Sequence, residues 1–168
     1  MQEQLSFEIN SGKLHITDPI LEYIPTNFFS LWDLPCLNGK WLVKLKESNE
    51  GEYWGNRITD LIVYHDSYDE YNTNYKEINK IKDIGTDTGK CGIYDSSIYP
   101  KKDESEKFNN LNSKLLDESF INVMEKGVIC ETGFGAGMYD INLKFEKKHL
   151  MYINIVFIND EIRNKIKK

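Results

Sequence analysis

The chain opens with alternating apolar and polar residues, a pattern that predicts β-strands. Every second residue is apolar over residues 5–9, and the alternation resumes over residues 13–17 after Gly12. A period of two places one face of a strand against a core, and a glycine between two such runs is typical of a hairpin turn. Asp18 and Pro19 then end the second strand, because proline has no N–H to donate to a neighbouring strand.

Similar patterns recur along most of the chain, over residues 40–46, 57–65, 77–84, 127–132, 139–146 and 149–158. The last of these segments is largely apolar on both faces, which predicts a central strand covered on both sides. Residues 20–35 are apolar and aromatic without a clear period, so we expect an irregular segment there. Residues 65–72 are rich in acids and tyrosine, which favours an exposed loop.

One helix is indicated. Asp103 and Glu106 have the spacing of a capping box, and Phe108, Leu111 and Leu115 follow at helical spacing until Gly127. About eight or nine short strands with one helical insertion near residues 103–126 predict a mainly β fold, either a β-sandwich or a partly open barrel. We expect a single domain over residues 1–168, since no repeat or linker divides the chain.

Composition narrows the classes of partner. The 168 residues include 21 Lys+Arg and 27 Asp+Glu, a formal charge of −6, which disfavours nucleic-acid polymers and membrane surfaces as partners. The nearly apolar run over residues 150–158 is too short for a transmembrane helix, and the N-terminus lacks the features of a signal peptide. The three cysteines are widely spaced without metal-binding motifs. We therefore expect a cytoplasmic protein with reduced thiols, no metal and no cofactor.

Three clusters combine glycine with short polar side chains, over residues 11–19, 86–95 and 132–140. Glycine lets a backbone approach a ligand closely, and aspartate supplies charge. For each cluster alone, a turn is the simpler interpretation. The candidate residues for binding a ligand or partner are Asp18, Asp87, Thr88, Gly89, Asp95, Gly133, Gly135, Gly137 and Tyr139.

Together, and in this order, the three clusters resemble the motifs of a bacterial and phage family, domain of unknown function 4241. The resemblance runs from about residue 11 to residue 158. The family has no established activity, but some members occur near toxin or defence loci, which implies an immunity or anti-defence role. The family's last turn reads Gly-Asp-Gly, whereas this chain has Ala136 between Gly135 and Gly137. A methyl group can neither ligate a metal nor act as a base.

The first hypothesis is therefore a non-enzymatic binding protein that captures a partner protein or a small signalling ligand in a cleft rimmed by the glycine turns. An acidic surface suits a basic partner such as a toxin, because opposite charges steer association. A nucleotide ligand would need a local basic patch instead, for which the candidates are Lys13, Arg57, Lys90 and Lys144.

The alternative hypothesis is a hydrolase or metal-dependent enzyme that uses clustered aspartates. Asp18, Asp87, Asp95 and Asp140 would then have to converge, either as acid and base or as oxygen ligands of a hard cation. The chain has no recognised catalytic motif and lacks an acid at Ala136. The sequence therefore leans away from an enzyme.

Overall fold

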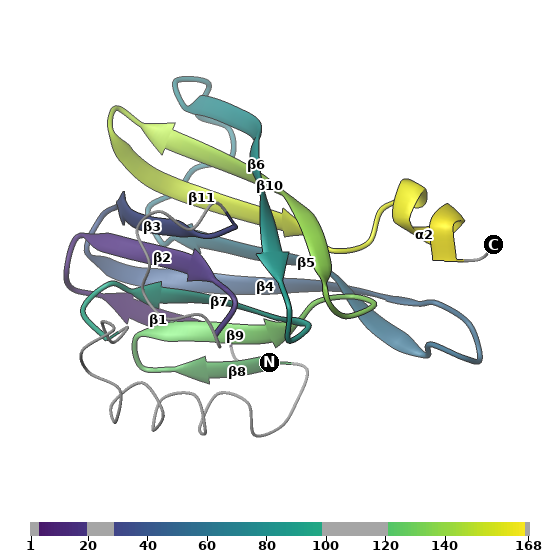
Figure 1. Ribbon diagram of the computed structural model, residues 1–168. Coiled ribbons are helices and arrows are strands. Elements are labelled where there is room, and N and C mark those ends of the chain that lie inside the picture. The colour runs from purple at the N-terminus through teal and green to yellow at the C-terminus, as the bar shows by residue number, and fades with distance from the viewer. Residues whose placement is uncertain (1–3, 20–28, 99–120, 167–168) are drawn as a thin grey trace.

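The computed structural model describes residues 4–19, 29–98 and 121–166, which form two antiparallel sheets. In spatial order, one sheet consists of β1 (Ser6–Ile9), β4 (Gly39–Asn49), β5 (Asn56–His65), β11 (His149–Val156), β10 (Gly137–Glu146) and β6 (Lys76–Thr86). The other consists of β3 (Leu31–Pro35), β2 (Lys13–Thr17), β7 (Lys90–Asp95), β9 (Gly127–Glu131) and β8 (Ile121–Met124). Figure 1 shows the two sheets packed as layers.

The core lies between the two layers because each strand turns alternate residues inward. The larger sheet supplies Trp41, Val43, Leu61, Val63, Ile141, Leu143, Ile153 and Ile155, and the smaller sheet supplies Leu14, Ile16, Cys91, Ile93, Val128 and Cys130. Burial of each large apolar side chain contributes about 1.5–3 kcal/mol to the hydrophobic stabilisation. The predicted mainly β fold is confirmed in its sandwich form, and the described strands close no barrel.

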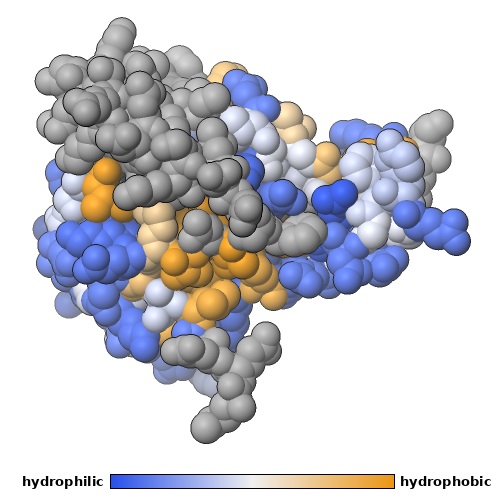
Figure 2. All heavy atoms as spheres, turned by 90° about the horizontal axis from the view of Figure 1, so that it is seen from below, coloured by the Kyte–Doolittle hydropathy of each residue, from blue (hydrophilic) through white to orange (hydrophobic). Residues whose placement is uncertain are grey.

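A smaller apolar cluster lies on the outer side of the five-stranded sheet. Tyr94 and Ile129 are buried there, and Trp32, Ile98 and Met124 pack against them. Seen from below, the surface of the molecule also gathers apolar side chains in one area, with hydrophilic side chains beside it (Figure 2). The smaller sheet is therefore apolar on both of its faces at these positions, whereas the outer face of the larger sheet carries more polar residues.

The described residues contain eleven strands, more than the eight or nine expected. The predicted helical insertion near residues 103–126 is wrong at its end, because residues 121–124 form an additional strand, β8, that pairs with β9. Gly127 begins β9 instead of ending a helix. A Cβ at Gly127 would lie 2.8 Å from a ring carbon of Tyr94, so close packing requires the glycine there. Residues 99–120, which hold the rest of the predicted helix, lie outside the described residues.

Two further expectations need correction. The segment 20–35, expected to be irregular, contains β3 at its end, whereas residues 20–28 lie outside the described residues. The final strand, β11, is central as predicted, since it lies between β5 and β10. It is not covered on both sides, because Tyr152, Asn154 and Val156 point outward and stay half-buried.

The C-terminal helix α2 (Asp160–Ile166) is anchored to the end of the β4–β5 hairpin. The guanidinium of Arg163 donates hydrogen bonds to both carboxylate oxygens of Glu50, with nitrogen–oxygen distances of 2.9–3.2 Å. The side chain of Asn159 caps the helix by accepting the Ile162 N–H at 2.9 Å. No helix in the described part of the chain is long and apolar enough to cross a membrane.

Candidate ligand-binding site at the glycine turns

Asp18 lies at the end of β2 and is fully buried. Its Oδ2 accepts the backbone N–H of Asp87 at 2.6 Å and that of Thr88 at 2.9 Å, and its Oδ1 accepts the Thr88 hydroxyl at 2.8 Å. Hydrogen bonds to an ionised acceptor are about twice as strong as neutral ones. The carboxylate therefore shapes the turn before β7 and does not face a ligand.

A second turn, residues 132–137, lies directly against this one. The N–H of Thr132 donates to the carbonyl of Gly89 at 2.9 Å. A Cβ at Gly89 would lie 3.1 Å from the Cα of Gly135, so the two backbones approach at a distance that leaves little room for a side chain. Both glycines also have positive φ, +70° and +115°. The structure thus brings the second and third glycine clusters together, and the end of the first cluster, Asp18, contacts the second.

Tyr139 holds the second turn from inside the protein. Its buried hydroxyl donates to the carbonyl of Gly135, which also accepts the Thr132 hydroxyl at 2.7 Å. Burial raises the pKa of Tyr139, so the hydroxyl keeps its proton and remains a donor. Tyr139 is therefore a structural support of the turn, not a surface that contacts a ligand.

A hollow of about 190 Å³ opens beside the two turns. Thr88, Gly89, Gly133 and Gly135, four of the candidate residues named from the sequence, line it. Its other lining residues are Trp54, Arg57, Lys90, Glu131, Thr132 and Phe134. Four segments of the chain meet here: the β4–β5 hairpin, the turn before β7 with the start of that strand, the end of β9 and the turn that follows it.

The hollow combines aromatic rings with basic side chains. The ring of Trp54 meets that of Phe134 edge to face, with centroids 4.9 Å apart, and the Arg57 guanidinium lies 5.6 Å from the Trp54 ring centre. The ion pair between Arg57 and Glu131 is long, at 3.9 Å. The Nε of Arg57 is buried without a hydrogen-bond partner among the described residues. Arg57 thus keeps hydrogen-bonding capacity that this part of the chain does not use.

A second hollow, of about 390 Å³, lies on the other side of the turn over residues 132–137. It is more apolar, because Phe29 and Met138 line it with about half of their surface exposed. Asp87 and Gly137 reach this hollow, and so does the exposed Ala136. The methyl group that replaces the acid expected from the family resemblance therefore adds to an apolar lining.

Asp95 does not join this site. Asp95 ends β7 and lies opposite Leu14 of β2. Asp18 comes four residues after Leu14, so the two aspartates are about 13 Å apart along the strand direction. The Asp95 carboxylate accepts the N–H groups of Asn10, Ser11 and Ser97 at 2.6–3.1 Å. Burial raises the pKa of Asp95, but these hydrogen bonds outweigh burial and lower it to about 2.

The four aspartates of the enzyme hypothesis do not converge. Asp18 and Asp95 bind turns at opposite ends of β2, Asp87 reaches the apolar hollow, and Asp140 lies in the other sheet, paired across strands with Asp83. Among the residues that the structure describes, no three histidines, cysteines or acids are placed to hold a metal ion. The four aspartates therefore lack the converging arrangement that the enzyme hypothesis requires.

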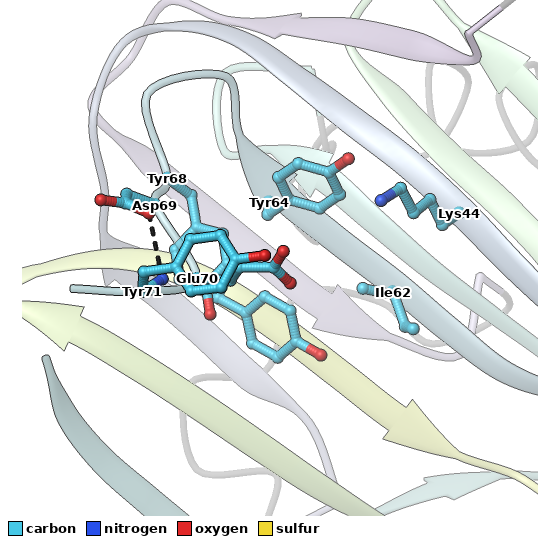
Figure 3. Close-up of a pocket in the computed structure, with 8 residues that line it drawn as sticks. Lys44, Ile62, Tyr64, Tyr68, Asp69, Glu70 and Tyr71 are labelled. Carbon is cyan, nitrogen blue, oxygen red and sulfur yellow. Dashed lines mark hydrogen bonds between the residues drawn. The ribbon is translucent and has the colours of Figure 1, made fainter. Parts of the chain in front are cut away.

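Sequence reasoning missed a third hollow, of about 440 Å³, on the outer face of the larger sheet (Figure 3). Its lining residues are Lys44, Ile62, Tyr64, Tyr68, Asp69, Glu70, Tyr71 and Tyr152. The sequence carried a partial signal, because Tyr64 and Tyr152 occupy outward positions of two strands. The position of the 65–72 loop over those strands could not be read from the pattern.

Comparisons of the chain with protein-family models, with curated proteins and with solved structures find no match. The resemblance to domain of unknown function 4241 therefore stays a prediction, carried by the three motifs between residues 11 and 158. A function for this protein has to be inferred from the geometry of its own side chains.

Proposed function

We propose that this protein is a non-enzymatic binding protein that captures a small, planar, anionic ligand of the nucleotide class beside its glycine turns. The observation that carries the proposal is the convergence of Trp54, Phe134, Arg57 and Lys90 on one hollow. Aromatic rings stack on planar bases, and a guanidinium binds phosphate or carboxylate oxygens through paired donors. A nucleotide offers both kinds of group.

The dimensions of the hollow suit part of such a ligand. A volume of about 190 Å³ is below the usual range for a drug-sized ligand, about 300–1,000 Å³, and fits a single ring system. The rest of the ligand then lies across the rim. A methyl group at Gly135 would meet no atom within 4 Å, so the backbone there is open to a ligand's approach.

The net charge of the chain does not oppose this ligand. Two of the four basic residues named from the sequence, Arg57 and Lys90, line the hollow. The hollow therefore offers positive charge although the net charge of the chain is negative. Capture without turnover fits the use of the Asp18 and Asp95 carboxylates, which bind backbone N–H groups. An immunity or anti-defence role, which the family resemblance implies, suits a protein of this kind and forms part of the proposal.

Isothermal titration calorimetry with AMP and ATP tests the proposal. The Arg57→Gln variant should bind at least about tenfold more weakly than the wild type, because it loses a charged hydrogen bond to the ligand. Lys148→Gln, which removes an exposed cation far from the hollow, is the matched control and should bind normally. Thermal unfolding confirms that both variants fold.

Three results would overturn the proposal. The first is the absence of binding of either nucleotide to the wild type, and the second is equal weakening in the two variants. The third is steady formation of a hydrolysis product that is lost in Asp87→Asn, since that result would show turnover. Product analysis of the titrated samples by chromatography separates this last outcome from simple capture.

A further inference from the structure

Tyr68 joins the loop over residues 66–75 to the outer face of the six-stranded sheet. Its ring stacks on that of Tyr75, with centroids 5.1 Å apart, and lies 5.0 Å from the ring of Tyr152 and 5.9 Å from that of Tyr64. The Nζ of Lys144 donates to the Tyr68 hydroxyl at 3.1 Å. The loop is therefore packed on the sheet through a group of tyrosines.

Hydrogen bonds within the loop fix its shape. The N–H of Asp69 donates to the Tyr75 hydroxyl at 3.1 Å, and the N–H of Tyr71 donates to the Asp69 carboxylate at 3.0 Å. The N–H of Asn74 donates to the side chain of Asn72 at 3.0 Å. These contacts hold Glu70 and Tyr71 beside the hollow of about 440 Å³, as Figure 3 shows.

The side chains of Glu70 and Tyr71, which line this hollow, make no ring contact, ion pair or side-chain hydrogen bond with the described residues. Tyr71 is 84% exposed, and its ring contacts no other ring among the described residues. The carboxylate of Glu70 makes no hydrogen bond or ion pair with the part of the chain that the structure describes, and it points toward the hollow in Figure 3. Tyrosine is enriched among the residues that dominate binding at protein interfaces.

The same surface already binds ammonium groups on tyrosine rings. The Nζ of Lys44 lies 5.1 Å from the ring centre of Tyr64, and the Nζ of Lys144 lies 5.1 Å from that of Tyr152. A cation near the face of an aromatic ring is attracted by the ring's quadrupole. The open ring of Tyr71, next to the carboxylates of Asp69 and Glu70, offers a similar position to a cation from outside.

We propose that this surface, Asp69, Glu70 and Tyr71 with the hollow beside them, docks a basic segment of a partner protein through an arginine side chain. Charge complementarity selects this occupant. Over residues 66–77 the exposed charged residues are Asp66, Asp69, Glu70 and Glu77 against Lys76 alone. Lys44, on the opposite wall, is turned onto the ring of Tyr64, which leaves the side of Glu70 to the arriving guanidinium.

The docking surface is independent of the nucleotide hollow. The lining residues of the two hollows do not overlap, and the preferred charges of their ligands are opposite. Failure of one proposal therefore leaves the other standing. A variant at Arg57 should not change peptide binding, and a variant at Tyr71 should not change nucleotide binding.

The test is an NMR titration of the full chain with a blocked peptide of alternating arginine and glycine. We expect the largest amide shifts within residues 66–75, and weaker binding as sodium chloride is added. Tyr71→Ala and Glu70→Gln should each weaken binding about two- to fivefold. Tyr53→Ala is the matched control, because Tyr53 is equally exposed, at 87%, but lies in the β4–β5 hairpin loop; it should bind as the wild type does.

Several outcomes contradict the docking proposal. One is the absence of shifts at millimolar peptide, and another is a shift map centred outside the loop. A third is equal weakening by Tyr53→Ala and Tyr71→Ala, which would show general adhesion of the peptide. Cellotetraose is titrated in parallel; if this neutral sugar shifts the loop and the peptide does not, the surface takes carbohydrate instead.

Discussion

The buried carboxylate of Asp18 accepts three hydrogen bonds from the turn at Asp87 and Thr88, about seventy residues further along the chain. The acid that the sequence offers as a candidate for chemistry thus determines the position of a loop. The loop in turn contributes Thr88 and Gly89 to the hollow beside the glycine turns. Asp18 therefore acts on the site through the backbone that it holds.

Replacing Asp18 with asparagine should destabilise the protein by about 2 kcal/mol or more, because the N–H groups of the turn lose a charged acceptor. Asp87→Asn, at an exposed carboxylate nearby, should change stability by less than about 0.5 kcal/mol. Urea unfolding followed by circular dichroism measures both values. Equal stability of the two variants would show that the Asp18 contacts contribute little.

Acid should destabilise the protein in two separate steps, the first of which comes from His15. Burial lowers the pKa of His15 to about 4, from 6.5, and its Nδ1 accepts the Asp33 N–H at 3.0 Å. Between pH 6.5 and pH 4 the unfolded chain binds a proton that the folded protein does not. Stability should therefore fall by about 3 kcal/mol over that range. His15→Asn should abolish this slope in urea unfolding at a series of pH values.

The second step comes from Asp95, whose folded pKa of about 2 lies below the ordinary 3.8. A carboxyl with a depressed folded pKa stabilises the protein above pH 4, and that contribution disappears as the pH falls through 2. His15→Asn should keep this second loss, whereas Asp95→Asn should remove it. A single acid transition, unchanged in both variants, would contradict the assignment of the two steps.

The three thiols should be inert in the folded protein. Cys36, Cys91 and Cys130 are each at most 3% exposed, and burial raises the pKa of all three, that of Cys36 to about 12. Since the thiolate is the reactive form, a chromogenic disulfide reagent at pH 8 should label none of them until urea is added, and then all three. Rapid labelling of one thiol without denaturant would show that this site opens locally.

Two glycines of one turn should respond differently to alanine. Gly135 has a φ of +115°, a conformation that side chains rarely adopt, although a methyl group there meets no atom within 4 Å. Gly137 lacks a positive φ, and a Cβ would approach the Tyr139 hydroxyl at an ordinary 3.4 Å. Gly135→Ala should therefore cost about 1–3 kcal/mol of unfolding free energy and Gly137→Ala clearly less. Equal losses in thermal unfolding would mean that backbone strain is not the cause.

Alternation along the chain predicted the larger part of the fold, because residues such as Leu14 and Ile16 indicate which face of a strand is buried. The prediction failed where the same apolar pattern is compatible with both a helix and a strand. Val123 fits a helical stripe as well as a strand, and the pairing of residues 121–124 with β9 decides between them. Such long-range pairing is not visible in a local pattern.

The candidate site was predictable only in part, for a similar reason. Glycine with short polar residues identified two turns that do meet, Asp87–Gly89 and the turn that contains Gly135. The local sequence around Asp95 looks equivalent but lies at the other end of the same strand pair. The role of Trp54 depends on where the β4–β5 hairpin ends in space, which the sequence pattern does not specify.

The two buried aspartates act in a reciprocal way on one pair of strands. Asp18 follows β2 and holds the turn that precedes β7, whereas Asp95 ends β7 and holds the turn that precedes β2. The pair therefore has an approximate local two-fold symmetry, with the same device at each end. A slip of β2 against β7 by one residue would break both sets of hydrogen bonds together, so the register of these strands is fixed from both ends. The hollow beside the glycine turns is therefore built on a strand pair whose register is held at both ends.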